Sequence, residues 1–407
     1  MTTASHRVDL FAPSLIDDPY PWYAELLETG YAEYTPPGRD ITLRVLSRHA
    51  DVQAVLRDPR FGRASFRAAL QNGLGDGPLA RVYSHWFLFH DPPDHTRLRA
   101  LVNQPFTPRA VDALRGRIAD LVEGLLDRQA GQAGSTFDLI GGFAYQVPVL
   151  VICELLGVPE ADRGRFGAWS AAVAAGLDNV TVTHDEALAR GNEGAEGLTD
   201  YFRWLVRERR RQPGSDLLTG LIQAEEAGDR LSQDELLATC VLLFFAGHET
   251  TVNLIGNGAL ALARHPDQLA RLRADPSLIV SAVEELLRFD SPVQRTGRDA
   301  REAVQLNGRF FAAGERVVLL VGAANRDPRQ FADPDRLDIG RPNAAAHLSF
   351  AAGIHYCVGA PLARLEAQVA LNALLRRAPN LRVLTDSPRW RRTFVLRGLS
   401  ELPVSLG

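Results

Sequence analysis

Lysine is absent from this chain, so all 45 of its basic residues are arginines, set against 49 aspartates and glutamates. The net charge is −4, and the longest run of basic residues is Arg209 to Arg211. A protein whose main partner is nucleic acid usually carries a strongly basic patch. The composition therefore argues against nucleic acid as the main partner.

Cysteine is also scarce, with only Cys153, Cys240 and Cys357. An odd number of widely spaced cysteines argues against a disulfide framework, so each thiol has to be explained by itself. The N-terminus lacks the basic and then apolar pattern of a signal peptide. The longest apolar run, residues 236–247, is shorter than the roughly 20 residues of a membrane span. These features predict a cytoplasmic protein without a membrane partner, and we expect a monomer.

The remaining composition, 46% hydrophobic and 23% charged, is that of an ordinary globular protein. Apolar residues recur with helical spacing along most of the chain. We expect helices over residues 107–126, 145–156, 160–175, 184–211, 232–263, 276–289 and 359–377, and short strands over 41–45, 293–321 and 381–404. Residues 61–89 lack a sustained period, which predicts a long mobile loop. Without an internal repeat or a linker, the chain is predicted to form a single domain, residues 1–407, mainly α with a minor β region.

One segment near the C-terminus places a thiol where a loop meets a helix. Cys357 lies between Gly353 and Gly359, and Phe350 precedes all three. The dipole and the unpaired amides of a helix N-terminus stabilise a thiolate, which can then act as a metal ligand. Flanking glycines would let the backbone approach a flat macrocycle closely. The segment therefore indicates a haem-thiolate site, although a buried free cysteine is the commoner role of a lone thiol.

Residues 350–366 together resemble the haem-binding loop of the cytochrome P450 superfamily, specifically its soluble bacterial members. Four further segments resemble family motifs in the right order along the chain, namely residues 91–99, 246–251, 285–288 and 325–336. The resemblance covers almost the whole chain and implies the cytochrome P450 fold. It also implies haem b as the cofactor, with Cys357 as the axial ligand of the iron. The cofactor-binding residues that it implies are His95, Arg99, Ala246, Arg298, Phe350, Gly353, His355, Cys357 and Gly359.

The two propionates of a haem need cations or hydrogen-bond donors in a protein interior. His95 and Arg99 lie four residues apart on one face of an expected helix and can reach a propionate together. By the resemblance, Arg298 and His355 are the other propionate partners. The resemblance also implies a structural triad that pins the cysteine loop, formed by Glu285, Arg288 and Arg336.

The helix expected over residues 232–263 carries the residues that the resemblance assigns to oxygen activation. Ala246 and Gly247 put two minimal side chains in mid-helix, which indicates that something bulky lies against that face. Glu249 and Thr250 match the catalytic acid and alcohol with which the family relays protons and holds water beside dioxygen. Thr250 could instead bond back to the carbonyl four residues earlier, the usual role of a mid-helix threonine. His248 matches no catalytic position and is expected to be a structural or channel residue.

These motifs predict a cytochrome P450 monooxygenase that inserts one oxygen atom of O2 into an organic substrate. The pocket implied by the resemblance is almost entirely apolar, which favours a hydrophobic terpenoid, steroid or polyketide-like molecule. Its expected lining residues are Trp86, Phe87, Phe89, Leu242, Phe245, Ala246, Val293, Gln294, Thr296, Val395 and Leu396. Because one haem domain uses the whole length, we expect electrons from a separate ferredoxin and ferredoxin reductase that dock near Arg97 and Arg364.

Two other classes of protein stay open. A haem-binding sensor without turnover would need the thiolate loop but neither an acid nor an alcohol, so Glu249 and Thr250 argue against it. A peroxide-dependent haem-thiolate enzyme or an isomerase typically departs from that pair, and this sequence keeps it.

Overall fold

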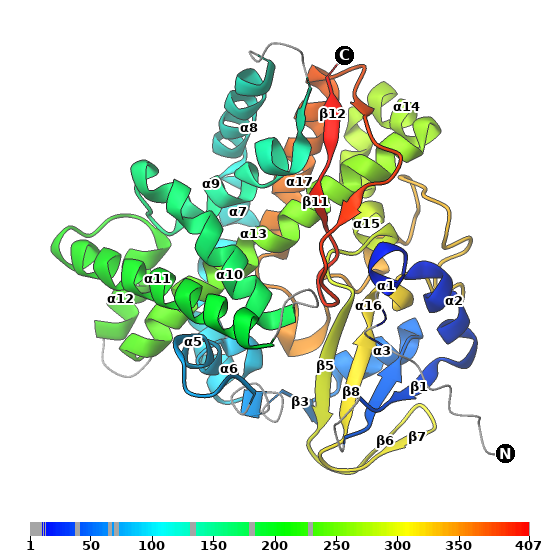
Figure 1. Ribbon diagram of the computed structural model, residues 1–407, viewed down its shortest axis with the longest axis horizontal. Coiled ribbons are helices and arrows are strands. Elements are labelled where there is room, and N and C mark those ends of the chain that lie inside the picture. Colours follow the sequence, from blue (N-terminus) through cyan, green and yellow to red (C-terminus); the bar gives the residue numbers. More distant parts are fainter. Residues whose placement is uncertain are drawn as a thin grey trace.

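The computed structural model describes residues 10, 12, 14–36, 41–63, 67–68, 73–130, 136–178, 184–226 and 231–406. Helices make up most of them and occupy the left and upper parts of Figure 1, while a small sheet and the N-terminal helices lie at the lower right. The helices are α1 (Ser14–Asp17), α2 (Tyr20–Thr29), α3 (His49–Arg57), α5 (Pro78–Ser84), α6 (Asp94–Val102), α7 (Pro108–Asp112), α8 (Arg115–Ala130), α9 (Gln146–Leu155), α10 (Phe166–Asp178), α11 (His184–Arg211), α12 (Leu217–Glu226), α13 (Gln233–Arg264), α14 (Pro266–Ala274), α15 (Ile279–Phe289), α16 (Val321–Ala324) and α17 (Ala360–Arg377). The mainly α prediction is confirmed.

The largest sheet has five strands in the order β1-β2-β8-β5-β3. These are β1 (Tyr31–Tyr34), β2 (Leu43–Leu46), β8 (Arg316–Leu320), β5 (Arg295–Ala300) and β3 (Phe61–Gly62). Strands β2 and β8 run parallel, and the other pairs in this sheet are antiparallel. Three smaller sheets pair β4 (Thr136–Asp138) and β9 (Arg382–Val383) with β12 (Pro403–Ser405), β6 (Val304–Leu306) with β7 (Arg309–Phe311), and β10 (Arg389–Trp390) with β11 (Leu399–Glu401). The minor β region is therefore real and is divided among several sheets.

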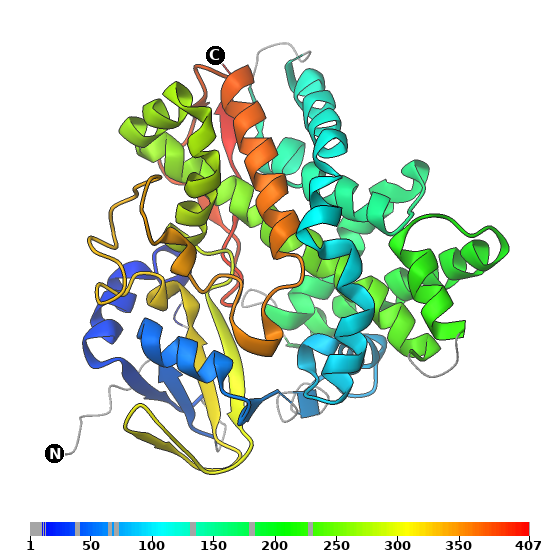
Figure 2. The same cartoon turned by 180° about the vertical axis from the view of Figure 1, so that it is seen from behind.

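The long helix α13 runs through the middle of the molecule. A capping box begins this helix, because the Ser232 hydroxyl accepts from the Glu235 amide at 3.2 Å and the Glu235 carboxylate accepts from the Ser232 amide at 2.8 Å. Figure 2 shows α17, in orange, crossing over α13, with α8 beside it. Among the described helices, α13 alone is long and apolar enough to cross a membrane, but 83% of its most apolar window is buried inside the protein. Helix α13 is therefore a helix of the protein core.

The prediction of one long mobile loop over residues 61–89 is wrong for the part that the structure describes. Strand β3, helix α5 and the short helix η1 (Phe87–Phe89) lie within it, whereas residues 64–66 and 69–72 are outside the described residues. Leu79 and Tyr83 of α5 are almost completely buried. Burial of these large side chains fixes the segment, although their spacing shows no sustained period.

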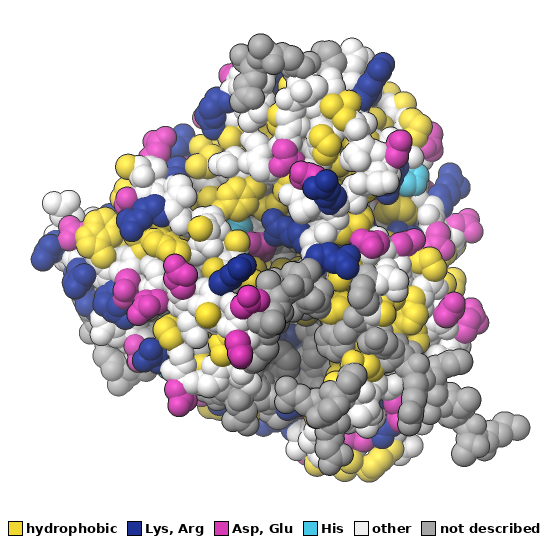
Figure 3. All heavy atoms as spheres, in the orientation of Figure 1, with side chains coloured by type: hydrophobic (Ala, Val, Ile, Leu, Met, Phe, Trp, Pro, Cys, Tyr) yellow, Lys and Arg dark blue, Asp and Glu magenta, His cyan; other side chains and the backbone are white. Residues whose placement is uncertain are grey.

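Acidic and basic side chains are interspersed over the face of the molecule shown in Figure 3. This mixture agrees with the net charge of −4.

Candidate active site

Cys357 lies between the short helix η7 (Gly353–His355) and the first turn of α17. Its amide donates to the carbonyl of Phe350 at 2.9 Å, so the loop folds back on itself. The cysteine has exposed surface, but loss of hydration among the surrounding atoms raises the pKa of its thiol. The amide of Gly359 and the guanidinium of Arg99 act in the opposite direction on this pKa. Donors aimed at the sulfur suit it to ligate a metal as a thiolate.

Position 353 needs a glycine because a backbone atom that the sequence did not reveal lies too close for a side chain. Its φ is +69°, and a Cβ atom on it would lie 2.4 Å from the carbonyl oxygen of Leu56 in α3. This glycine therefore lets the cysteine loop lie against the backbone of α3, and its expected role beside a macrocycle stays a prediction. Gly359 is under no such constraint, since a Cβ there would stand 4.0 Å from the sulfur of Cys357.

Phe350 supports the loop by packing. Its ring lies under the guanidinium of Arg364, 4.5 Å from the ring centroid. Arg364 is itself bound to Glu284 at 2.6 Å. Phe350 and these two charged residues therefore tie the cysteine loop to α15 and α17.

One short stretch of α13 faces open space while the rest of its middle is buried. Between Leu236 and Leu262, only Ala246 is exposed, and only Gly247 and Thr250 are partly exposed. Ala246 and Thr250 lie one helical turn apart and so share a face. A Cβ on Gly247 would instead lie 3.1 Å from Ile152 of α9. The expected bulky neighbour of Gly247 is thus a side chain of this protein, whereas Ala246 faces the open space beside α13.

The acid and the alcohol of α13 have different surroundings. Thr250 makes the predicted bond back to the carbonyl of Ala246, but at 3.4 Å this bond is long. Glu249 is 4% exposed, and its carboxylate accepts from Arg391 at 2.6 Å. Burial raises the pKa of Glu249, but His248 and Arg391 outweigh it and hold this pKa at about 2. Glu249 is therefore ionised in this arrangement.

His248 is fully buried, which fits its expected structural role. One ring nitrogen contacts the carbonyl of Phe244 at 2.8 Å, and the other contacts the hydroxyl of Ser170 at 3.1 Å. The second nitrogen also lies 3.4 Å from the carboxylate of Glu249. His248 thus holds Glu249 in place from one side while Arg391 holds it from the other.

Four buried nitrogens near the cysteine loop have no hydrogen-bond partner among the described residues. They are Nε of Arg63, Nε2 of His95, Nη2 of Arg298 and Nε2 of His355. The two histidine rings are 4.3 Å apart. Burial, followed by the charge of Arg99, lowers the pKa of His95 to about 4, and burial also lowers the pKa of His355. A set of buried donors without acceptors fits an anionic group, such as the propionates of a haem.

Arg99 has a different setting from the other expected propionate partners. Its two terminal nitrogens donate to the carbonyls of Ile354, at 2.9 Å, and of Tyr356. These carbonyls flank His355 in the loop that leads to Cys357. Arg99 therefore braces the cysteine loop from α6.

The predicted structural triad is present with one member exchanged. Arg288 donates to Glu285 at 2.7 Å, and both side chains are fully buried. The second cation on Glu285 is Arg341, at 3.1 Å from both carboxylate oxygens, and not Arg336. Arg336 contributes its backbone carbonyl, which accepts from Arg288 and from Arg341. The expectation for the Arg336 side chain is wrong because the irregular segment before Arg341 brings that guanidinium to the carboxylate.

The expected substrate pocket divides into two groups. The aromatic side chains in residues 86–89, together with Phe245 of α13, belong to the core. Trp86 is completely buried, and its ring stacks on those of Phe89 and Phe245 with ring centroids 5.9 and 5.5 Å apart. Phe87 and Leu242 are also buried. Partly or fully exposed side chains are those of Val293, Thr296, Val395 and Leu396. An isolated bridge joins Val293 to Leu396, so the β5 side and the C-terminal loop meet.

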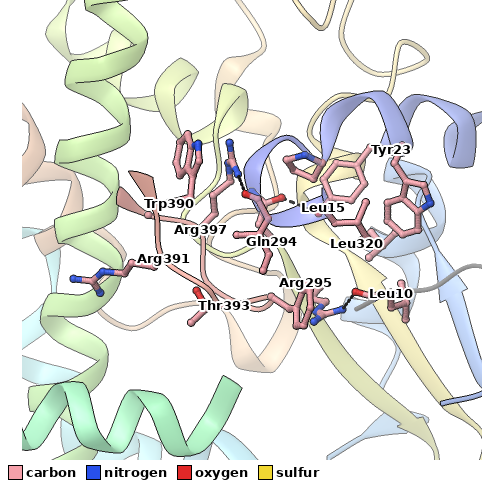
Figure 4. Close-up of a pocket in the computed structure, with 15 residues that line it drawn as sticks. Leu10, Leu15, Tyr23, Gln294, Arg295, Leu320, Trp390, Arg391, Thr393 and Arg397 are labelled. Carbon is pink, nitrogen blue, oxygen red and sulfur yellow. Dashed lines mark hydrogen bonds between the residues drawn. The ribbon is translucent and has the colours of Figure 1, made fainter. Parts of the chain in front are cut away.

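The expectation that Gln294 lines the substrate pocket is wrong, because its side chain has a structural role. Its carbonyl oxygen accepts from the Tyr23 hydroxyl at 2.8 Å, and its amide donates to Ser291 at 2.7 Å. Figure 4 shows Gln294 within a pocket between the N-terminal helices and the C-terminal loop, where Arg391 points away from the other labelled side chains. The amide of Gln294 is therefore committed to this junction.

Comparisons with known proteins identify the family to which this fold belongs. The family model described as "Cytochrome P450" matches residues 177–379. Cytochrome P450 107B1 of Saccharopolyspora erythraea is 46% identical over 374 residues, which are 89% of each chain. Vitamin D(3) 25-hydroxylase of Pseudonocardia autotrophica is 43% identical over 413 residues, covering 100% of this chain and 98% of the relative. The structure of P450BioI in complex with hexadec-9Z-enoic acid ligated acyl carrier protein has a TM-score of 0.88 at 38% identity, covering 97% of this chain and 100% of that one.

The fold and the cysteine loop thus define a cytochrome P450, and the chain belongs to this family. Its relatives are bacterial cytochrome P450 hydroxylases and monooxygenases, so the protein is an enzyme of the monooxygenase class. Membership of the family implies a haem-iron cofactor.

Proposed function

We propose that this monooxygenase binds haem b through the thiolate of Cys357 and oxidises a hydrophobic small molecule with O2. The observation that carries the proposal is the set of buried, unpartnered nitrogens around a loop that presents a thiol. His95, Arg298 and His355 would hold the propionates, with Arg99 bracing the loop. Phe350, Gly353 and Gly359 would shape that loop, and Ala246 would lie against the macrocycle. When bound, the haem supplies the redox chemistry that activates dioxygen.

Proton supply is the proposed task of Glu249 and Thr250. A site dry enough to retain a hydrophobic substrate cannot take protons directly from bulk water. Glu249 exchanges protons with solvent-linked waters on the side of Arg391, whose side chain is 30% exposed. The Thr250 hydroxyl, held by a long bond to Ala246, passes a proton into the open space beside α13 and accepts one from a neighbouring water.

The proposed substrate is an uncharged terpenoid, steroid or polyketide-like molecule. Ala246, Val293, Val395 and Leu396 would offer apolar surface to it, with Thr296 as a polar neighbour. A relative that is a vitamin D(3) hydroxylase supports a substrate of this size class.

A ferredoxin, reduced by its reductase, is the proposed electron donor, and the enzyme is proposed to be a cytoplasmic monomer. We further propose that residues 1–407 form one haem domain. The expected docking charges need revision, because Arg97 is paired with Glu235 at 2.6 Å and Arg364 with Glu284 at 2.6 Å. A paired arginine attracts an acidic partner less than a free one.

The test of the haem-thiolate site is the carbon monoxide difference spectrum of single-cysteine variants. Cys357→Ala should lose the spectrum typical of haem-thiolate proteins. Cys153→Ala and Cys240→Ala are matched controls, because both thiols are buried in the core, and they should keep it. An unchanged spectrum in Cys357→Ala would end the proposal.

A further inference from the structure

The contacts of His248 fix the position of one ring proton and leave the other ring nitrogen free to gain or lose a proton. The ring is fully buried between α13 and α10. Its Nδ1 lies 2.8 Å from the carbonyl oxygen of Phe244. A carbonyl oxygen can only accept, so Nδ1 carries a hydrogen in both charge states of the ring. The charge of His248 is therefore decided at Nε2.

The contact between Nε2 of His248 and the carboxylate of Glu249 requires a proton. The two atoms are 3.4 Å apart. A neutral imidazole and an ionised carboxylate would point two lone pairs at each other at this distance. A proton on either atom makes the contact attractive, as imidazolium with carboxylate or as imidazole with carboxylic acid. His248 and Glu249 are therefore built to share one proton.

The groups that face this pair place the shared proton on His248 in the resting protein. Arg391, from the C-terminal loop, donates to the other carboxylate oxygen of Glu249 at 2.6 Å and favours its ionised form. Tyr145, directly before α9, sets its ring edge-on to that of His248 with centroids 5.7 Å apart. Burial, followed by the charge of Glu249, raises the pKa of Tyr145 to about 12, so this neighbour is neutral at pH 7. The remaining polar neighbour, Ser170 of α10, is an uncharged hydroxyl.

Solvent alone would rarely load Glu249 with a proton. Because its pKa is held at about 2, roughly one molecule in 10⁵ would carry the proton at pH 7 if Glu249 titrated alone. The proposed reaction consumes two protons per turnover, since one oxygen atom leaves as water. His248 is itself a cause of this low pKa, and its charge disappears when its proton moves to Glu249. A proton already stored on His248 thus avoids the transfer from bulk water.

Ser170 satisfies Nε2 of His248 both before and after such a transfer. Its hydroxyl oxygen lies 3.1 Å from Nε2. A hydroxyl can accept from the protonated nitrogen and, after rotating, donate to the bare one. Loss of the proton therefore leaves no buried nitrogen without a partner, which would otherwise oppose the transfer.

We propose that His248 stores a proton for the relay and gives it from Nε2 to the near carboxylate oxygen of Glu249, which passes it towards Thr250. The N–H bond breaks with its electron pair left on Nε2, and an O–H bond forms on Glu249. A solvent proton that later reaches Glu249 past Arg391 restores the store. His248 acts through Glu249 and is therefore a positioning residue. The inference rests on the proposed function, which makes Glu249 the acid of the relay.

The first measurement is nitrogen NMR of isotope-labelled histidines in the carbon monoxide-bound holoenzyme. The signals of His248 are those that are missing from His248→Gln. In the parent, both nitrogens of this ring should carry protons at neutral pH. In Glu249→Gln, which lacks the carboxylate, Nε2 should lose its proton at a lower pH than in the parent. A bare Nε2 in the parent at neutral pH overturns the inference.

The second measurement is oxygen uptake by the holoenzyme with NADPH, ferredoxin, ferredoxin reductase and testosterone as the probe substrate. The parental rate should fall as the pH rises from about 6 to about 9, because the stored proton is lost. His248→Gln, which can keep the polar contacts, should be about tenfold slower at about pH 6 and change less with pH. The matched control is His265→Gln, since Nδ1 of His265, directly after α13, also contacts the carbonyl four residues earlier, at 2.7 Å.

His265→Gln should keep the rate and the pH profile of the parent. A ring that only packs against Glu249 would affect thermal stability without changing the shape of the pH profile. His248→Gln with the parental rate and pH profile therefore overturns the inference, even if the NMR signals show a charged ring.

If His248→Gln does not accumulate as a holoenzyme, the NMR measurement on the parent and Glu249→Gln decides the question. The histidine signals that respond to Glu249→Gln then identify His248, and a charged ring supports the inference while a neutral one overturns it. The carbon monoxide spectrum and the oxygen uptake of the parent test the proposed function separately. A parent that is active but insensitive to the loss of His248 refutes this inference alone.

Discussion

The carboxylate of Glu249 is bound to the guanidinium of Arg391 at 2.6 Å, although 142 residues of chain separate them. The side chain of Glu249 is 5% exposed and that of Arg391 is 30% exposed. The pair therefore connects the partly hydrated C-terminal loop with the middle of α13, one residue from Thr250. This connection underlies the first three predictions.

Thr250→Ala should leave substrate binding and haem reduction largely intact but release peroxide in place of product, because the hydroxyl that is proposed to donate the proton is lost. The measurement is product formed per NADPH consumed with the proposed redox partners. Thr251→Ala is the control, since Thr251 points about 100° away around the helix and is buried. If Thr250→Ala stays as well coupled as the parent, the hydroxyl is only a helix-packing group.

Glu249→Gln should slow oxygen consumption by about tenfold or more, because an amide fills the same space without relaying a proton. Stopped-flow reduction and the carbon monoxide spectrum should be close to those of the parent. Oxygen uptake at the parental rate would remove Glu249 from the proposed proton path.

The stability of the enzyme should depend on pH through Glu249. Its pKa is held at about 2 in the folded protein, below the ordinary 4.5 of a glutamate. The ionised group therefore stabilises the fold above about pH 4.5, and this contribution, on the order of 3 kcal/mol, is lost as the pH falls from about 4.5 to about 2. Urea unfolding of the parent and of Glu249→Gln should differ most at neutral pH and converge in acid. A constant difference would contradict the assignment.

Arg341→Met should lower the free energy of unfolding by about 3–5 kcal/mol, because it leaves the fully buried Glu285 with one cation fewer. Arg336→Met is the matched control, since only the backbone carbonyl of Arg336 contacts this cluster, and its effect should stay within about 0.5 kcal/mol. Denaturant unfolding measures both. Equal losses in the two variants would show that the side chain of Arg336 also takes part.

Gly353→Ala should destabilise the protein by about 1–3 kcal/mol, because a side chain at positive φ would also meet the backbone of Leu56. Gly359→Ala should cost less, since its φ is −82° and space is available there. Thermal unfolding measures both variants. A Gly353→Ala protein as stable as Gly359→Ala would mean that α3 moves aside without cost.

The sequence predicts what depends on neighbouring residues along the chain. The helical spacing of residues 184–211 predicts α11 with its observed ends, and Ser232 with Glu235 predicts the start of α13. Glu285 and Arg288 are one turn apart, so their pairing is local. Arg391 and Arg341 could not be found in this way, because each reaches its carboxylate from a distant irregular segment. The resemblance predicts Trp86 in the substrate pocket, and only the packing of Tyr83, Phe89 and Phe245 around it shows that it belongs to the core.

The two small residues of α13 have unequal value for protein engineering. Ala246 is exposed and lies, by the proposed function, beside the substrate, so a larger residue there should reshape the space for the proposed substrate and alter the range of compounds accepted. Gly247 meets Ile152 of α9 at 3.1 Å from a Cβ position, so a larger residue there would push two helices apart instead. A library intended to change selectivity should therefore vary Ala246 and leave Gly247 untouched.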